Sequence, residues 1–263
     1  MLRIINLNLN GIRSAWRKGV LPWLIEQRAE IVCLQELKAQ HADLSEEMNA
    51  PPGFRAYYHC AAKKGYSGVG LWCRSEPDRV IDQLGSAEFD VEGRYLRADF
   101  GNLSVVSLYQ PSGSSSEQRQ EAKYRFMALI YPLLLELVTS GRDVVVGGDW
   151  NIAHRELDLK NWRSNRQNSG FLPEERAWIS RLLDEAGWCD AFRQLHPTAS
   201  DDSYTWWSNR GQAWAKNVGW RLDYQLATPA IAARAKRAAV FKEQRFSDHA
   251  PLTIDYDHDP GST

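Results

Sequence analysis

Residues 147–154 read Gly147-Gly148-Asp149-Trp150-Asn151-Ile152-Ala153-His154 and directly follow the apolar run Val144-Val145-Val146. An aspartate before the run and two glycines after it bound a short segment, which predicts a buried β-strand. An acid and an amide two residues apart at the end of such a strand point the same way into a cleft, where they could hold a water against a phosphorus atom. Asp and Asn are also ordinary residues of a turn, so the stretch alone fits catalysis and a structural turn equally.

The composition indicates neither disorder nor a fibrous repeat. With 263 residues, 43% of them hydrophobic, the chain can bury a substantial core. The 32 Lys and Arg nearly balance the 33 Asp and Glu, so net charge does not predict a non-specific coat for nucleic acid. There is no long uncharged apolar run, and the chain opens on a strand instead of a signal peptide. We therefore expect a cytoplasmic monomer with no membrane association and with reduced cysteines.

Strands and helices are spread along the whole chain, with no linker or repeat between them. We expect strands at residues 2–9, 30–35, 69–73, 94–100, 103–109 and 252–256, a helix at 16–28, a second helix that follows the polar loop 114–121 and runs to about 140, and a helix that starts at 173. Strands 94–100 and 103–109 are expected to pair as a hairpin. This pattern favours a single domain over residues 1–263.

Several polar residues lie at the ends of these strands. Asn8 and Asn10 share one face of the first strand, either on a solvated edge or facing a cavity; a cavity is favoured because Asn is a poor strand former. Glu36 follows an interior strand, at the end where open α/β sheets bind ligands, although a surface acid paired with Lys38 would give the same pattern. Tyr109 ends its strand at the same sheet end, and a buried tyrosine with a satisfied hydroxyl is the alternative.

The second half of the chain carries features that suit nucleic acid. The polar loop 154–170 interleaves cations with amides, including Asn165 and Asn168, as phosphate contacts along a strand require. A solvated loop would look similar. Trp206 and Trp220 lie among basic residues, which suits a sugar or base stacked beside a phosphate, although indoles also fill cores.

A histidine close to the end of the chain is a candidate for a charged site. His249 directly follows Asp248, and a second acid, Asp223, is within reach by folding. A lone histidine at such a position is more often structural, so this reading depends on the acids around it.

Taken in order, these residues resemble the exonuclease III branch of the endonuclease/exonuclease/phosphatase superfamily, and the resemblance spans essentially the entire chain. The motifs that carry it are N-x-N-G at Asn8–Gly11, L-Q-E-x-K at Leu34–Lys38, Y-S-G-V-G at Tyr66–Gly70, G-D-W-N at Gly148–Asn151, N-x-G-F-x-P-E-E-R at Asn168–Arg176, W-R-x-D-Y at Trp220–Tyr224 and S-D-H-A-P at Ser247–Pro251. Each motif is weak alone, and seven in the same order are specific.

The resemblance implies a four-layer α/β sandwich with two mixed β-sheets packed face to face and helices outside. It also implies a hydrolase of base excision repair that cuts DNA phosphodiesters with the help of a divalent metal. The expected partner is double-stranded DNA with 3′ ends or abasic sites. Many relatives remove nucleotides in the 3′-5′ direction, and many also incise beside abasic sites.

The resemblance also implies roles for individual residues. Asp149 would orient and deprotonate a water, and Asn151 would donate to the phosphate. Asp223 would fix the tautomer of His249 and raise its basicity, so that a cationic imidazole meets the phosphate. Tyr109 would lie near the leaving group or the phosphate.

The implied ligands and contacts complete this list. Glu36, with Asn8 or Asn10 and with Asp248 as a further candidate, would hold Mg²⁺ or Mn²⁺; few carboxylates completed by water suit Mg²⁺ better than zinc. The residues expected to contact DNA are Tyr66, Arg94, Asn165, Asn168, Trp206, Asn217, Trp220 and Leu222.

Three points bear on the alternatives. Relatives proficient at abasic sites often carry Asn or Gln where this chain has Ser112, which leaves open the balance between exonuclease and abasic endonuclease. Catabolite repression control proteins share this fold, lack active-site residues and act in RNA-binding assemblies, whereas this chain keeps every expected acid and the histidine. Lipid and RNA-tail phosphodiesterases are disfavoured by the 165–176 loop and the tryptophans.

Overall fold

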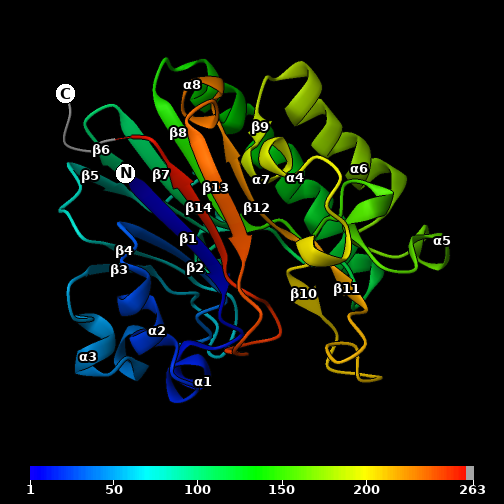
Figure 1. Cartoon of the computed structure of the whole chain (residues 1–263). Helices are drawn as coiled ribbons and strands as arrows, with labels where there is room; N and C mark the ends of the chain where they lie inside the picture. The colour runs from blue at the N-terminus through cyan, green and yellow to red at the C-terminus, as the bar shows by residue number, and fades with distance from the viewer. Residues whose placement is uncertain (259–263) are drawn as a thin grey trace.

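The computed structural model describes residues 1–258 and contains two six-stranded sheets packed face to face with helices around them (Figure 1). The first sheet has the order β13 (Ala235–Val240), β14 (Leu252–Tyr256), β1 (Leu2–Asn8), β2 (Ile31–Gln35), β4 (Val69–Cys73) and β3 (Arg55–His59). The second has the order β5 (Arg79–Ile81), β6 (Tyr95–Phe100), β7 (Leu103–Tyr109), β8 (Asp143–Asp149), β12 (Asp223–Ala227) and β9 (Cys189–Asp190). Each sheet has one parallel pair, β1 with β2 and β7 with β8, so both are mixed, as expected.

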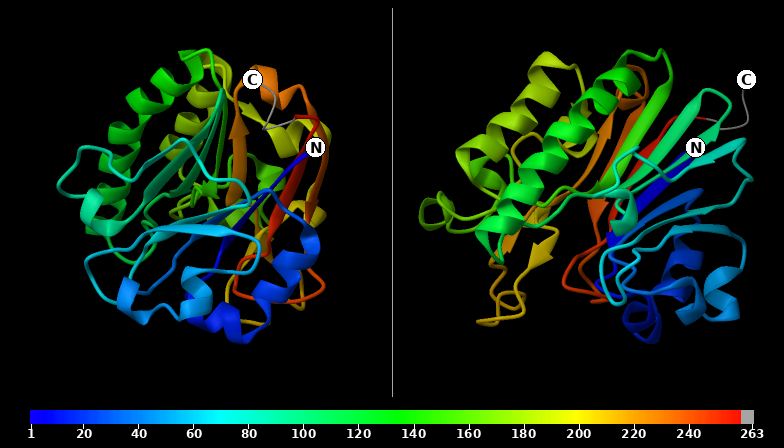
Figure 2. Two further views of the ribbon diagram at one scale, coloured as in Figure 1. Left: turned by 90° about the vertical axis from the view of Figure 1, so that its left-hand side faces the viewer. Right: turned by 180° about the vertical axis from the view of Figure 1, so that it is seen from behind.

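Helices cover the two outer faces (Figure 2). On the first sheet lie α1 (Ile12–Arg17), α2 (Val20–Gln27) and α3 (Glu46–Asn49), and on the second lie α4 (Glu117–Thr139) and α6 (Pro173–Ser180). The remaining elements are α5 (Trp162–Asn165), α7 (Ala191–Leu195), α8 (Pro229–Ala232), a small ribbon of β10 (Trp206–Trp207) with β11 (Gly219–Trp220), the 3₁₀ turns η1 (His41–Asp43), η2 (Asp90–Glu92), η3 (Glu156–Asp158) and η5 (Asp201–Ser203), and the π-turn η4 (Arg181–Glu185). None of the helices within residues 1–258 has the length and apolar character needed to cross a bilayer.

The alternation of side chains along the strands divides the core into layers. Ile4, Cys33 and Val145 face the space between the sheets, whereas neighbours on the same strands face the helices. Gly148 lets β8 lie close to β7, because a Cβ there would come within 2.0 Å of the Leu108 carbonyl oxygen.

The structure differs from the expected elements in three places. The helix expected at 16–28 is two helices, because Gly19 has φ +84° and a left-handed residue cannot continue a right-handed helix. The long helix begins at Glu117, inside the stretch expected to be a loop, because the Ser116 hydroxyl caps it by accepting from the Arg119 amide. The loop expected at 154–170 contains η3 and α5.

A buried ion-pair network supports the segment that precedes β12. The Asp158 carboxylate accepts hydrogen bonds from Arg193 and, at 2.7 Å, from Arg221, whose other end bonds Asp190 at 2.7 Å. Arg221 also lies 4.1 Å from the centroid of the Tyr224 ring. Burial alone would raise the pKa of Asp158, but the arginines outweigh it and lower the pKa to about 2.

We expect Asp158→Asn to lower the free energy of unfolding by about 3–5 kcal/mol at pH 7, because it leaves two arginines buried without their shared carboxylate. In the wild-type chain the folded pKa of about 2 lies below the ordinary 3.8, so the ion pair contributes about 2 kcal/mol above pH 4 that is lost between pH 4 and pH 2. Urea unfolding of both proteins between pH 7 and pH 3 measures this. An equal difference in stability at pH 7 and pH 3 would contradict it.

Candidate active site

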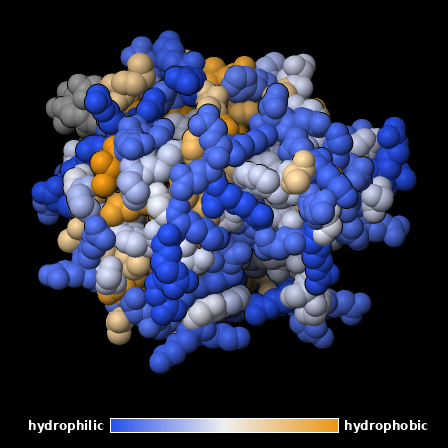
Figure 3. Space-filling model, turned by 60° about the horizontal axis from the view of Figure 1, so that its bottom comes forward, coloured by the Kyte–Doolittle hydropathy of each residue, from blue (hydrophilic) through white to orange (hydrophobic). Residues whose placement is uncertain are grey.

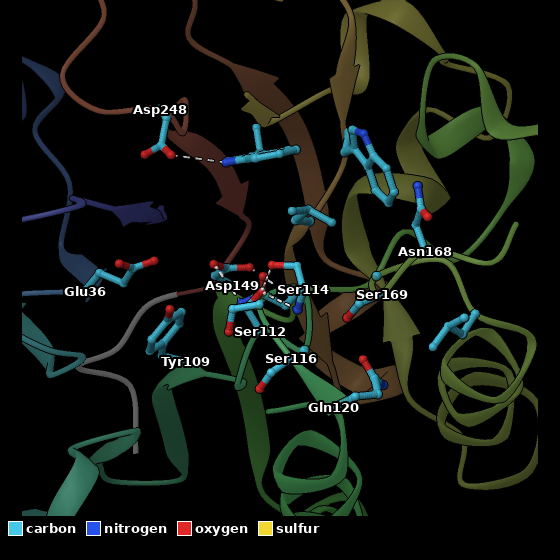
Figure 4. A pocket seen from close by; sticks show the side chains of 18 of the residues that line it. Glu36, Tyr109, Ser112, Ser114, Ser116, Gln120, Asp149, Asn168, Ser169 and Asp248 are labelled. Carbon is cyan, nitrogen blue, oxygen red and sulfur yellow. Dashed lines mark hydrogen bonds between the residues drawn. The ribbon is translucent and has the colours of Figure 1, made fainter. Parts of the chain in front are cut away.

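A pocket of about 720 Å³ opens where β2, β7 and β8 end (Figure 4). The parallel pairs and the packing of the sheets bring these three strand ends to one edge, and the segment that enters β14 reaches the same edge from the opposite direction. The surface at this end of the molecule is mostly hydrophilic (Figure 3). The pocket is lined by residues that include Glu36, Tyr109, Asp149, Asn168, Trp220 and His249.

Asn8 joins the two acids at the base of the pocket. Its amide nitrogen donates to Glu36 and to Asp149, each at 2.9 Å, while its oxygen accepts from the Asn10 backbone amide at 2.9 Å. Because two carboxylates and one N–H surround the side chain, only this orientation satisfies all three. Asn8 is fully buried and does not itself line the pocket, so it lies beneath the two acids, with its oxygen turned away from them.

Asp149 is the last residue of β8 and is 1% exposed. Burial raises the pKa of its carboxyl to about 7, and the charges of Asp223 and Glu36 add to this while His249 opposes it. The Asn151 backbone amide donates to Asp149 at 2.9 Å. A carboxyl held in this way can change protonation near neutral pH.

His249 lies between two acids. Its Nδ1 is 2.8 Å from an Asp223 oxygen, and its Nε2 is 3.7 Å from an Asp149 oxygen. Burial would lower the pKa of the imidazole, but the charges of Asp223 and Asp149 outweigh it and raise the pKa to about 10. His249 is therefore cationic at neutral pH.

Glu36, Asp149 and His249 form a group whose oxygen and nitrogen atoms lie within 4.8 Å of one another and could hold a metal ion. Because a protonated imidazole has no free lone pair, the two carboxylates are the available ligands. Two acids of this kind, completed by water, suit a hard divalent cation. The Lys38 ammonium also lies 2.6 Å from a Glu36 oxygen. Glu36 therefore both pairs with Lys38, as the alternative interpretation of the sequence expects, and lines the pocket.

The other residues expected to hold a metal lie to one side. Asn10 donates to Asp248 at 2.7 Å, and the Lys38 ammonium, which donates to the Asn10 oxygen at 2.6 Å, lies between Asn10 and Glu36. Burial would raise the pKa of Asp248, but His249 and Asn10 outweigh it and lower the pKa. The structure brings Asp248 to the rim of the pocket and leaves Asn10 outside it.

The Endonuclease/Exonuclease/phosphatase family model matches residues 5–249 of the chain. The chain belongs to this family. It is 35% identical over 254 residues to the exodeoxyribonuclease of Bacillus subtilis (strain 168), which covers 96% of this chain and 98% of that protein. It is also 35% identical over 255 residues to the DNA repair nuclease APEX1 of Danio rerio, covering 96% of this chain and 81% of that protein.

The fold is shared as well. The solved structure of an AP endonuclease from Archaeoglobus fulgidus superposes with a TM-score of 0.89 at 28% identity, covering 98% of this chain and 100% of that one. The family membership and the α/β sandwich expected from the sequence are both confirmed.

In this member of the endonuclease/exonuclease/phosphatase family, the ring of Tyr109 packs against the guanidinium of Arg94. The Arg94 guanidinium lies 4.9 Å from the centroid of the Tyr109 ring and donates to the Tyr109 carbonyl at 3.2 Å. It also bonds Glu92 and, at 2.7 Å, the Tyr66 hydroxyl. Arg94 is 2% exposed. It therefore supports the two tyrosines from behind and is not at the surface where DNA would lie.

The aromatic wall of the pocket comes from the small ribbon. Trp206 and Trp220 meet edge to face with centroids 6.3 Å apart, and Leu222 lies beside them. Asn168 lines the same pocket, and Asn165 lines an adjoining hollow of about 370 Å³ with both tryptophans.

Asn217 is not brought to this wall. Its oxygen accepts from the Trp207 indole at 3.0 Å, and its amide donates to the Asp201 carbonyl at 3.0 Å.

Two buried residues behind the pocket have no role among the site residues expected from the sequence, although Glu175 belongs to the motif at Asn168–Arg176. Lys123 of α4 and Glu175 of α6 are both fully buried. Lys123 precedes Met127 by four residues and so lies on the apolar face of its helix. A cation on an apolar face was the signal that could have identified it.

Proposed function

We propose that this chain is a metal-dependent DNA phosphodiesterase of base excision repair that acts as a 3′-5′ exodeoxyribonuclease on duplex DNA and also incises beside abasic sites. The observation that carries this proposal is the convergence of a buried acid with a pKa near 7, a cationic histidine and a second carboxylate in one pocket. The relatives named exodeoxyribonuclease and AP endonuclease support the DNA substrate.

The surroundings of each residue indicate its role in phosphodiester hydrolysis. Asp149 accepts a proton from the attacking water, since its pKa lies near the working pH. Asn151 exchanges its longer bond to Asp149, 3.3 Å, for a phosphate oxygen. His249 donates a charge-assisted hydrogen bond from Nε2 to the phosphoryl oxygens, with its other nitrogen held by Asp223. Tyr109, which lines the same pocket as Glu36, would lie near the leaving oxygen or the phosphate.

A divalent cation, Mg²⁺ or Mn²⁺, held by Glu36 with Asp149 close by, would supply charge stabilisation on the phosphate. Asn8 would keep the two acids at a constant separation through its donated hydrogen bonds. We expect Asn8 to act in this way instead of as a ligand, because its oxygen is already used by the Asn10 amide.

The pocket wall fits the end of a DNA strand. Trp206, Trp220 and Leu222 would pack against the 3′-terminal or abasic sugar, and Asn165 and Asn168 would hold the flanking backbone. Tyr66 accepts from both Arg94 and Arg119, so it would orient Arg119, which neighbours the pocket residue Gln120. We propose that a single domain over residues 1–263, acting as a cytoplasmic monomer, carries this activity.

The first test uses two end-labelled duplexes, one with a recessed 3′ end and one with an internal abasic-site analogue, each in Mg²⁺ and in EDTA. We expect shortening from the 3′ end and a single incision at the abasic site, both abolished by EDTA and in the Asp149→Ala control. Shortening alone would limit the function to the exonuclease. No cleavage of either duplex, with DNA or RNA still bound, would favour a non-catalytic regulator.

A further inference from the structure

Lys123 and Glu175 form an ion pair that no solvent reaches. The Lys123 ammonium lies 2.6 Å from a Glu175 oxygen, and both side chains are 0% exposed. A buried pair of this kind gains little stability over an apolar pair of the same volume, because both charges lose their hydration. Its contacts with the pocket, described next, indicate a further role.

Lys123 makes a second contact, with the segment that carries the acid. Its ammonium donates to the Asn151 backbone carbonyl at 2.8 Å. Asn151 has φ +51°, in the left-handed region that a non-glycine residue adopts at some cost. Lys123 therefore holds the carbonyl in the direction that this strained backbone requires. The Asn151 backbone amide donates to Asp149, so Lys123 affects the position of the Asp149 carboxylate through Asn151.

Glu175 makes its other contacts with the loop that contains Gly170 and Leu172 and with Gln120 of α4. One of its oxygens accepts from the Gly170 and Leu172 amides at 2.7 and 3.0 Å, and the other accepts from the Gln120 side chain at 3.0 Å. Gly170, Leu172 and Gln120 all line the pocket. Glu175 thus fixes the position of the loop that contains Gly170 and Leu172 relative to α4.

The two halves of the arrangement also touch directly. The Ala153 amide donates to the Gly170 carbonyl at 2.7 Å. A Cβ at Gly170 would lie 3.2 Å from the Asn151 carbonyl oxygen, and its φ of +92° also requires glycine. The loop and the segment after β8 therefore lock together around the ion pair.

We propose that the Lys123–Glu175 pair positions the active site, with Lys123 holding the Asn151 backbone behind the catalytic acid and Glu175 holding the pocket wall against it. The kinetic consequence rests on the proposed DNA hydrolysis, whereas the positioning itself does not. Neither residue touches substrate, so both act through the segments they hold.

Four variants separate positioning from stability. Lys123→Met alone strands the Glu175 charge in the interior and should lower the melting temperature, whereas Lys123→Met/Glu175→Gln removes both charges and should recover most of it. We expect kcat of the double variant to stay at least ~10-fold below wild type, with KM changed less than ~3-fold, because the acid is misplaced and the aromatic wall is intact. Glu175→Gln alone isolates the contribution of the carboxylate. Arg3→Met is the control variant. It breaks the ion pair between Arg3 and Asp255, whose atoms lie 2.6 Å apart and far from the pocket, and it should lower stability without lowering kcat.

A second measurement needs no DNA cleavage. Hydrogen exchange at the Gly170 and Ala153 amides should be at least ~10-fold faster in the double variant than in wild type. In Arg3→Met, under conditions where its free energy of unfolding equals that of the double variant, exchange at these amides should match wild type. If wild type did not cut DNA, the proposed function would fail and this measurement would still test the positioning. Recovery of both kcat and amide protection together with stability in the double variant would overturn the inference and leave the pair a purely structural one.

Discussion

The Asp149→Ala variant should hydrolyse duplex DNA at least ~10²-fold more slowly than the wild-type chain while remaining folded. The acid is buried at the end of β8, and burial raises the pKa of its carboxyl to about 7, so that it accepts a proton at neutral pH. The substitution removes a carboxyl from an acidic cluster and leaves the strand unchanged, so little stability should be lost. Single-turnover rates on a duplex with a recessed 3′ end, together with thermal unfolding, measure both effects.

Asp149→Asn is the matched control for shape. It retains an oxygen that can accept the Asn151 amide but cannot take a proton from water. We expect its rate to be as low as that of the alanine variant. A rate within threefold of wild type in either variant would remove Asp149 from the role of general base.

The second large effect is expected from the partner of the histidine. Asp223→Asn should lower turnover by ~10²-fold or more, because the buried imidazole loses the charge that keeps it protonated. The pKa of His249 is raised to about 10 against its own burial chiefly by Asp223, so it should fall in the variant. Above this lowered pKa the imidazole is neutral and no longer places a positive charge against the phosphate.

Two measurements follow this change. A titration of the His249 ring by nuclear magnetic resonance gives the pKa in both proteins without any substrate. The rate of the variant, followed from pH 6 to pH 10, should decline at a lower pH than that of wild type, since deprotonation of His249 removes the donor. An unchanged ring pKa with a normal rate would show that Asp223 has no electrostatic role. His249→Ala is the control that removes the donor at every pH.

Much of the architecture could be predicted from the sequence, because strands and helices follow from local patterns. The Val144–Val146 run, the hairpin at 94–109 and the polar ends of the strands lie where alternation and turn residues place them. The helix at 16–28 was predicted without its break, since the pattern of apolar residues continues across Gly19 and only the backbone shows the left-handed turn.

The burial and contacts of several site residues could not be predicted from local sequence patterns. The family resemblance implies that Arg94 contacts DNA, yet its guanidinium lies buried against Tyr109 and Tyr66. Lys123 and Glu175 lie 52 positions apart, and they meet behind the pocket only because α4 and α6 pack together.

The sequence by itself determined which chemical groups the chain carries and at which strand ends they stand, because side-chain type and the periods of helix and strand are local properties. The tertiary structure alone decided how those groups act. It turned the Asn8 nitrogen toward two acids, set His249 between Asp223 and Asp149, and buried Asp149 deeply enough to raise its pKa. The physical reason is that hydrogen-bond direction and burial depend on atoms contributed by distant parts of the chain, which meet only when the two sheets pack together.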